Sequence, residues 1–393
     1  MTVQLEPIPD HVPLPAGFRA SGLHCGLKKA GQFDLGLLVA DEPVAAAAIF
    51  TQNQLVGAHV VVCREHLERG RFRVRAVLVN ARNANCATGQ QGIEDARLCC
   101  RELAARLRCP TEQVLMASTG PIGAPLPKER IVGKLDELVA RASPDGALDF
   151  ARAIMTTDTY PKARHQPGAP AVTGFAKGSG MIHPQMATML GFLLTDGTSG
   201  DGAATTALLQ RVANRSFHRV TVDGDTSPND TLLLLANGRQ RAGDVEGPLT
   251  ALAQRLARAL AADGEGATRL VTVEVRGART EAEASHVGRV IATSPLVKTA
   301  VAGRDPNWGR ILSAAGRAGI AFPAERARVW VGPADVYSGG RPHPENEPLA
   351  HQHLTGQESV VLGVDLGTGT AGADVWTCDF TKDYVQINAD YRS

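Results

Sequence analysis

The chain has 393 residues, of which 44% are hydrophobic and 21% charged, and its formal net charge is +1 at pH 7. This composition is ordinary for a globular protein with a sizeable core. It contains no long basic run, because glutamates interrupt the densest stretch at 64–75, so we expect no nucleic-acid partner. No segment approaches the roughly 18 apolar residues of a membrane helix, and the N-terminus lacks the features of a secretory signal.

The cysteines point to a cytoplasmic location. There are seven, an odd number, and none forms a CxxC pair. Cys99 and Cys100 are adjacent and would bridge each other only with difficulty. Reduced, mostly buried thiols fit this pattern best.

The apolar pattern predicts strands and helices mixed through both halves of the chain. In order, we expect a strand at 77–79, helices at 93–107 and 131–138, a strand at 232–235, a helix at 249–260, and strands at 272–275, 328–331 and 360–364. Residues 162–170 and 339–348 have the composition of linkers or loops. This mixture predicts an α/β or α+β layered architecture.

The most informative segment is residues 177–190, KGSGMIHPQMATML. It places Thr188 directly after the small residue Ala187, downstream of a Gly-rich turn. A Thr hydroxyl can attack the preceding carbonyl and, after an N-to-O acyl shift and hydrolysis, become the first residue of a new chain. Its α-amine, with an ordinary pKa of about 7.7–8.0, can then act as the base for its own hydroxyl. A Gly turn before a buried helix would look similar, so the pattern alone leaves both interpretations open.

This segment resembles part of a known family, and the resemblance continues over nearly the whole chain. Residues 177–190 resemble the self-cleavage site of the ornithine acetyltransferase family (ArgJ), the bifunctional glutamate N-acetyltransferases of arginine biosynthesis. Further ordered matches occur at Gly17–Leu23, Ala117–Gly123, Met155–Thr159, Val220–Thr226, Asn229–Thr231, Asp263–Thr268, Gly303–Arg310 and Ile387–Tyr391.

The resemblance implies a fold and an assembly. The fold would be an αββα sandwich with two subdomains, of the type shared by DmpA and ArgJ proteins. Cleavage between Ala187 and Thr188 would give an α chain, 1–187, and a β chain, 188–393. These chains would assemble as an α2β2 heterotetramer.

It also implies an activity. Thr188 would carry acetyl from N2-acetyl-ornithine to glutamate by a ping-pong mechanism, with Thr119 and Gly120 forming the oxyanion hole. No metal or organic cofactor is expected. Some members of the family also use acetyl-CoA as acetyl donor, and the residues leave that alternative open.

The remaining site residues are carried over from the family position by position. Lys177 would bind a substrate carboxylate and Glu265 a substrate ammonium. Thr157, with Thr156 beside it, would contact substrate. The C-terminal contacts would be Asn388 and Ser393. The residues alone also allow ordinary structural interpretations. Lys177 could be a surface residue, Glu265 could cap a helix, residues 155–159 could be a helix-ending turn, and the C-terminal tail could be frayed.

Other signals carry less weight. Residues 365–370, DLGTGT, resemble a phosphate loop of the sugar-kinase and actin type, but too little chain follows them to build that domain. His343, His351 and His353 lie in or near a Pro-rich loop without the spacing of a metal site.

The chain also departs from the family pattern in three places. Ala81 and Arg82 stand where the family has Ser-Gly, and His183 and Gln185 where Ala and Asn are common. Arg82 would change a pocket wall and leaves acceptor choice open. Two rival functions remain: a self-cleaving aminopeptidase of similar fold, which usually has Ser as nucleophile, and an uncut amino-acid-binding protein without catalysis.

Overall fold

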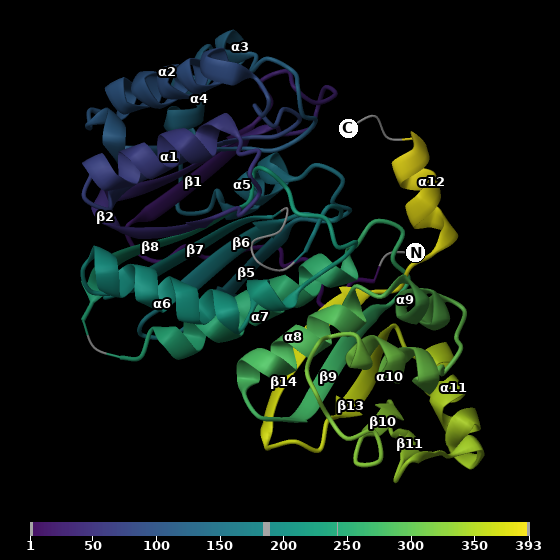
Figure 1. Ribbon diagram of the computed structural model, residues 1–393. Helices are drawn as coiled ribbons and strands as arrows, with labels where there is room; N and C mark the ends of the chain where they lie inside the picture. Colours follow the sequence, from purple (N-terminus) through teal and green to yellow (C-terminus); the bar gives the residue numbers. More distant parts are fainter. Residues whose placement is uncertain (1–2, 184–188, 242, 391–393) are drawn as a thin grey trace.

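A computed structural model describes residues 3–183, 189–241 and 243–390 of the chain. The predicted cleavage pair Ala187 and Thr188, together with Gln185 and Ser393, lies outside the described residues. The chain forms two lobes, a larger one that ends with α7 and a smaller one that begins with β9 (Figure 1). The connection between β6 and β7, which contains the predicted cleavage site, belongs to the larger lobe.

The larger lobe contains strands and helices in alternating blocks. Its strands are β1 (Phe18–Leu23), β2 (Leu35–Phe50), β3 (Arg73–Asn80), β4 (Val114–Ser118), β5 (Lys162–Gln166), β6 (Val172–Lys177), β7 (Leu190–Gly197) and β8 (Thr231–Gln240). Its α-helices are α1 (Ala58–Arg69), α2 (Gly89–Leu107), α3 (Lys128–Val132), α4 (Leu135–Ala140), α5 (Ala147–Ile154), α6 (Gly202–Asn214) and α7 (Glu246–Ala262).

The described strands of this lobe form one eight-stranded sheet in the order β4-β3-β2-β8-β7-β6-β5, with β1 paired to β2. The 16-residue strand β2 makes this arrangement possible. Its first part pairs with β1 and β3, and its last part, from Ala45 to Phe50, pairs with β8. The sheet therefore folds over at β2 into two stacked layers.

Three hydrophobic clusters fill the spaces between the layers. Residues of β2, β3 and β4 pack one face against α1–α4. Their other face meets β6, β7 and β8, where the Phe150 ring of α5 lies edge-on to Phe175 and Phe192. The outer face of β6–β8 is covered by α6 and α7. Figure 1 shows these helices above and below the paired sheets, which is the expected αββα sandwich.

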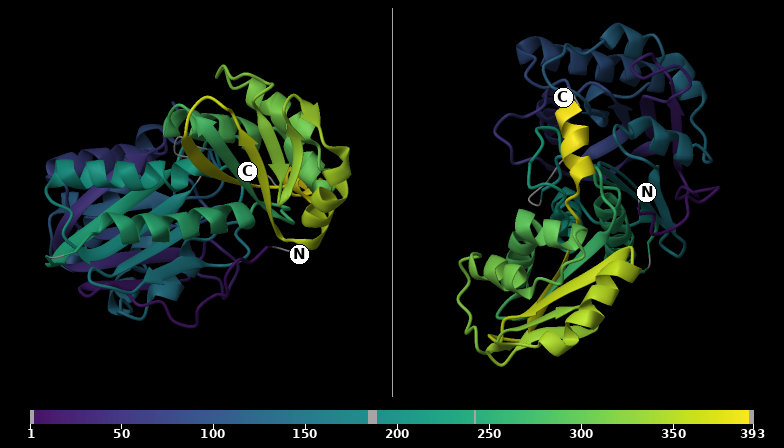
Figure 2. Two further views of the ribbon diagram at one scale, coloured as in Figure 1. Left: turned by 90° about the horizontal axis from the view of Figure 1, so that it is seen from below. Right: turned by 90° about the vertical axis from the view of Figure 1, so that its right-hand side faces the viewer.

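The smaller lobe is a six-stranded sheet in the order β12-β11-β10-β13-β9-β14, with its own apolar core. Its elements are β9 (Leu270–Ala278), α8 (Glu281–Ala292), α9 (Pro295–Ala302), α10 (Trp308–Gly316), β10 (Arg328–Val331), β11 (Ala334–Ser338), β12 (Arg341–Pro342), α11 (Glu347–Gly356), β13 (Ser359–Asp365) and β14 (Ala371–Cys378). Helix α12 (Lys382–Asp390) then leaves this lobe and runs back beside the larger one (Figure 2).

Two sequence predictions need correction. Residues 162–170 are not a linker, because Lys162–Gln166 is strand β5 at the edge of the sheet, and Lys162 is buried. The charged composition misleads because Asp158 and Asp263 surround the Lys162 ammonium, at 2.7 and 2.5 Å. The single helix expected at 131–138 is two short helices, α3 and α4, which separate at Gly133 and Lys134.

Candidate active site

A cavity of about 130 Å³ lies where the strand ends of the larger lobe meet the last turn of α12. Its wall is built from seven separate parts of the chain: the loops after β3, β4, α5, β6 and α7, the loop before β8, and α12. The lining residues are Ala84, Thr119, Gly120, Pro121, Ile122, Thr156, Thr157, Lys177, Gly180, Met181, Ser227, Pro228, Asn229, Glu265 and Asn388.

This wall includes every predicted site residue that the structure describes. The seven are Thr119, Gly120, Thr156, Thr157, Lys177, Glu265 and Asn388. The first and the last of them, at 119 and 388, are 269 positions apart in sequence, and the fold brings all seven around one cavity.

Thr119 and Gly120 both line the cavity, and each has one hydrogen-bond donor without an acceptor among the described residues. The Thr119 N–H is taken by the carbonyl of Asn80 at 3.0 Å, so it is not one of them. The Thr119 hydroxyl accepts a hydrogen bond from Lys177 Nζ at 3.1 Å, which leaves its own proton free to point elsewhere. Within the described residues, the Gly120 N–H has no hydrogen-bond acceptor. Two such donors side by side are what a developing oxyanion requires.

Gly120 is required by the backbone at this point. Its φ is +141°, and a Cβ there would lie 2.4 Å from the carbonyl carbon of Arg82 and from the nitrogen of Asn83. Asn83 donates its N–H to the Thr119 carbonyl at 3.0 Å, which joins the two loops. Only glycine allows this close approach, and the approach fixes the direction of the Gly120 N–H.

Lys177 is a buried cation at the end of β6, and only 3% of it is exposed. Burial lowers the pKa of its ammonium, whereas Asp158 acts in the opposite direction. Asp158 is itself buried; burial alone would raise its pKa, but Lys162, Lys177 and the Gly178 N–H hold that pKa below its usual range. Lys177 is therefore a positive charge at the cavity wall that Asp158 compensates only in part.

Glu265 lines the same cavity as Lys177 and supplies the opposite charge. It follows α7 in a Gly-flanked turn, where its N–H donates to the Ser179 carbonyl at 2.8 Å. The carboxylate packs on Gly180, since a Cβ there would lie 2.4 Å from Glu265 Oε2. Asn388 of α12 donates to the same Oε2 at 3.0 Å, so the C-terminal helix is tied to the cavity.

The hydroxyls of the 156–159 turn have different surroundings. Thr157 Oγ1 is hydrogen-bonded to Ser179 Oγ at 2.6 Å. Thr156 donates its N–H to Asp158 at 3.0 Å, and no hydrogen bond of its hydroxyl is found within the described residues. Thr156 is therefore the freer of the two hydroxyls, and it also lines a second cavity.

Sequence reasoning gave no role to Asn229, although it belongs to a matched motif. Its side chain donates to the carbonyls of Ala84 and Ser118, at 2.5 and 2.7 Å, and so links the loop before β8 to the loop after β3 and to the end of β4. The signal was the polar run at 223–230 between two apolar stretches, which indicates a loop but not its contacts.

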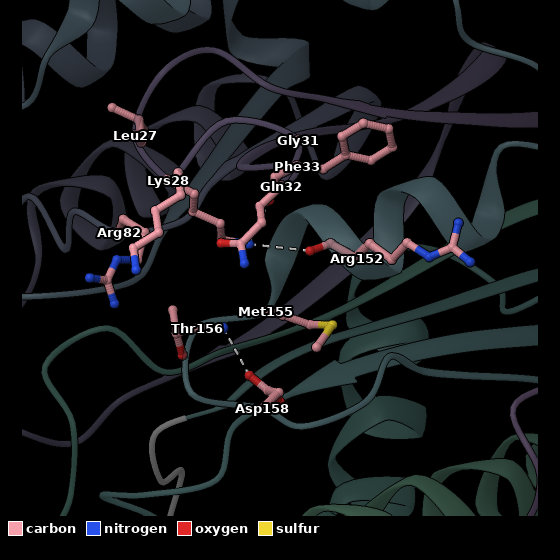
Figure 3. Close-up of a pocket in the computed structure, with 11 residues that line it drawn as sticks. Leu27, Lys28, Gly31, Gln32, Phe33, Arg82, Arg152, Met155, Thr156 and Asp158 are labelled. Carbon is pink, nitrogen blue, oxygen red and sulfur yellow. Dashed lines mark hydrogen bonds between the residues drawn. The ribbon is translucent and has the colours of Figure 1, made fainter. Parts of the chain in front are cut away.

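A larger cavity of about 840 Å³ adjoins the first and shares Thr156 with it (Figure 3). Its wall is rich in cations. The lining residues are Leu27, Lys28, Lys29, Gly31, Gln32, Phe33, Arg82, Arg152, Met155, Thr156 and Asp158.

The weaker sequence signals take structural roles. The three histidines share no hydrogen-bond partner within the described residues. His343 bonds to the Ser338 hydroxyl and the Glu345 carboxylate, His351 to the Arg304 carbonyl, and His353 to the Val361 N–H. Within the described residues, no three His, Cys, Asp or Glu side chains are placed to hold a metal ion. None of the described helices has the length and apolar character needed to cross a bilayer.

Comparison with known proteins identifies the family that the sequence resembles. The sequence model of the ArgJ family matches residues 19–393. The chain belongs to the ArgJ family. It is 42% identical over 416 residues to the arginine biosynthesis bifunctional protein ArgJ of a Synechococcus strain, with all of both chains covered. It is 43% identical to the ArgJ protein of a Synechocystis strain, with 98% of both covered.

ArgJ proteins have also been solved. The ornithine acetyltransferase of Mycobacterium tuberculosis, solved as a complex with ornithine, is 31% identical; the match covers 44% of this chain and 95% of that one, with a TM-score of 0.39. Family membership makes the present chain an acyltransferase, homologous to the bifunctional ArgJ proteins of arginine biosynthesis.

Proposed function

We propose that this ArgJ protein cuts itself between Ala187 and Thr188 and then moves acetyl from N2-acetyl-L-ornithine to L-glutamate through an acetyl-Thr188 intermediate. One observation carries the proposal: two donors without an acceptor among the described residues, a buried ammonium and a carboxylate from distant segments line a single cavity. This combination suits an acetylated amino acid whose α-carboxylate and side-chain ammonium need opposite charges.

Each group has a part in the first half-reaction. The Thr188 hydroxyl attacks the acetyl carbonyl of acetyl-ornithine while its free α-amine takes the hydroxyl proton. The Thr119 hydroxyl and the Gly120 N–H donate to the oxyanion that forms. The tetrahedral intermediate collapses, the C–N bond breaks, and ornithine leaves with the proton on its amine.

The second half-reaction reverses these steps with another amine. The α-amine of glutamate attacks acetyl-Thr188 and the same two donors stabilise the oxyanion. The bond from the acetyl carbon to Thr188 Oγ then breaks, the α-amine of Thr188 transfers the proton of the attacking nitrogen to Oγ, and N-acetyl-glutamate departs. Lys177 would hold the α-carboxylate of either amino acid. Glu265, Asn388, Thr156 and Thr157 would contact the rest of the substrate, with Ser393 completing the site.

The assembly and the donor range are also part of the proposal. The α chain, 1–187, and the β chain, 188–393, would associate as an α2β2 heterotetramer. Acetyl-CoA would serve as a second acetyl donor. No metal or organic cofactor takes part in these steps.

Intact-mass measurement and a two-substrate assay test the proposal. Wild-type protein should give two fragments, one of which begins with Thr188. The Thr188→Ala variant should stay whole and be inactive, and Thr188→Ser should still be cut. Transfer of acetyl from acetyl-ornithine to glutamate should far exceed hydrolysis of a peptide substrate. An uncut Thr188→Ala protein with full transferase activity would refute the mechanism.

A further inference from the structure

Arg82 has an unusual backbone conformation beside the candidate active site. Its φ is +68°, in the left-handed region, which is unfavourable for residues other than Gly, Asn or Asp. Its neighbours hold it there: Ala81 donates its N–H to the Asp34 carbonyl at 2.9 Å, and Asn83 donates to the Thr119 carbonyl at 3.0 Å. Strain that the surroundings enforce is concentrated at functional sites.

This conformation places Arg82 between the two cavities. Its carbonyl carbon would lie 2.4 Å from a Cβ on Gly120, so its backbone touches the proposed oxyanion donor. Its side chain lines the larger cavity, on the same wall as Lys28 and facing Thr156 (Figure 3). Because Thr156 also lines the smaller cavity, a ligand held at the oxyanion donors can extend toward Arg82.

The guanidinium of Arg82 is without a hydrogen-bond or ion-pair partner in the described part of the chain. The carboxylate in this cavity, Asp158, is already bonded to Lys162 and to the N–H groups of Thr156 and Gly178. The Lys28 ammonium is bonded to backbone carbonyls, at 2.5 Å from that of Phe33. The larger cavity therefore has an excess of positive charge and a free planar donor that fits a carboxylate in two-point fashion.

The two substrates differ in the charge at the end of their side chains. Ornithine ends in an ammonium, for which Glu265 is a suitable partner. Glutamate ends in a carboxylate, which the Glu265 carboxylate would repel if it occupied the same place. The acceptor side chain therefore needs a cation in another direction from the oxyanion donors.

We propose that Arg82 binds the side-chain carboxylate of the acetyl acceptor, glutamate, and so selects the acceptor in the second half-reaction. This inference rests on the proposed function. The donor and acceptor side chains then take different directions from the same reacting centre, ornithine toward Glu265 and glutamate toward Arg82. Lys28 strengthens the positive field around the carboxylate.

The variants for the test are Arg82→Gly and Arg82→Lys. Glycine accepts φ of +68° without strain, so the first variant removes the charge while relieving the backbone. The matched control is Arg108→Gly, which makes the same change at an exposed residue with φ of +52° at the end of α2. The thermal midpoint of each protein shows that it is folded.

Two reactions separate the acceptor from the donor. Exchange of labelled ornithine into acetyl-ornithine uses the nucleophile, the oxyanion donors and Glu265, but not glutamate. Transfer to glutamate uses Arg82 as well. In Arg82→Gly we expect KM for glutamate to rise roughly 10- to 100-fold, the effect of losing a charged hydrogen bond, with exchange within twofold of wild type. Arg82→Lys should recover part of the loss, and preference for glutamate over glutamine should fall only when Arg82 is changed.

Three results would overturn the inference. KM for glutamate within twofold of wild type in Arg82→Gly would exclude the contact. An equal loss in exchange and in transfer would show that Arg82 supports the common machinery instead. A loss confined to acetyl-CoA as donor would assign the cationic cavity to phosphate groups. Absence of exchange in the wild-type enzyme is a different outcome, because it would refute the proposed function itself.

Discussion

The carboxyl group of Asp230 accepts the backbone N–H of Met189 at 3.0 Å, and the Met189 carbonyl accepts the N–H of Thr231 at 3.1 Å. The residue that follows Thr188 is thus held on both sides by the start of β8. Asp230 is 1% exposed, and burial raises its pKa well above the usual range. Burial therefore disfavours the charged form of the carboxyl group that holds Met189, the first described residue after the proposed nucleophile.

This relationship predicts different results for two substitutions of Asp230. Asp230→Asn keeps an acceptor for Met189 and resembles the neutral carboxyl, so the free energy of unfolding at pH 7 should change by less than about 1 kcal/mol. Asp230→Ala leaves the Met189 N–H buried and unpaired, which should cost about 1–3 kcal/mol. Urea unfolding in the uncut Thr188→Ala background checks both values. Equal losses in the two variants would show that the hydrogen bond is unimportant.

Removing the Thr119 hydroxyl should slow the chemistry without weakening substrate binding. In Thr119→Val the oxyanion loses one of two donors, so kcat should fall by about 10²- to 10³-fold. Thr119→Ser retains the hydroxyl and the bond from Lys177, and should stay within about tenfold of wild type. Single-turnover acetylation of Thr188 measures this step directly. A rise in KM with unchanged kcat would place the hydroxyl in ground-state binding instead.

The buried charge cluster around Lys162 should be the most sensitive electrostatic feature of the larger lobe. Lys162→Met would leave Asp158 and Asp263 buried without their cation, at an expected cost of about 3–5 kcal/mol in the free energy of unfolding. The control is Lys134→Met, which breaks a 2.7 Å pair with Glu137 whose side chains are 45% and 38% exposed, and should cost at most about 1 kcal/mol. Denaturant titration at pH 7 should show the two effects clearly apart.

The stability of the protein should fall in acid partly because of His59. Burial lowers the pKa of His59 to about 4, so the unfolded chain takes up a proton below about 6.5 while the folded chain does not. The neutral ring makes its full contribution to the free energy of unfolding above about pH 6.5, and this contribution decreases until the pH reaches about 4. Between pH 7 and pH 5 the loss is about 2 kcal/mol. His59→Gln should lose less stability than wild type over this range. Parallel pH curves for the two proteins would exclude His59 as the cause.

The sequence predicted β9 and α7 well because each has a periodic apolar face that is buried. The stretch 272–275 lies in β9, whose inward residues Val271, Val273 and Val275 are buried in alternation, and 249–260 lies in α7. The prediction for 162–170 was wrong because the cation of Lys162 is neutralised by Asp263, which is 101 residues away. A local pattern contains no information about such a partner.

The candidate site could also be predicted only in part. The resemblance supplied seven residues that the fold gathers around one cavity, but their roles stay predictions, and Ala187, Thr188 and Ser393 lie outside the described residues. Neither the bridge from Asn229 to Ser118 nor the left-handed backbone of Arg82 could be foreseen. Both depend on how two loops meet in space, and the residue types involved are common in loops that do nothing similar.

Strand β6 pairs antiparallel with β7, with Lys177 opposite Leu190, and β7 is also paired to β8. The proposed scissile bond therefore lies in a hairpin whose arms are both locked into the same sheet. Hydrolysis there would create a new C-terminus and a new N-terminus without releasing a fragment, because β6 and β7 would stay joined by backbone hydrogen bonds. Cleavage would therefore make unfolding hard to reverse. Two fragments separated by denaturant would have to rebuild together a sheet that first formed from one continuous chain.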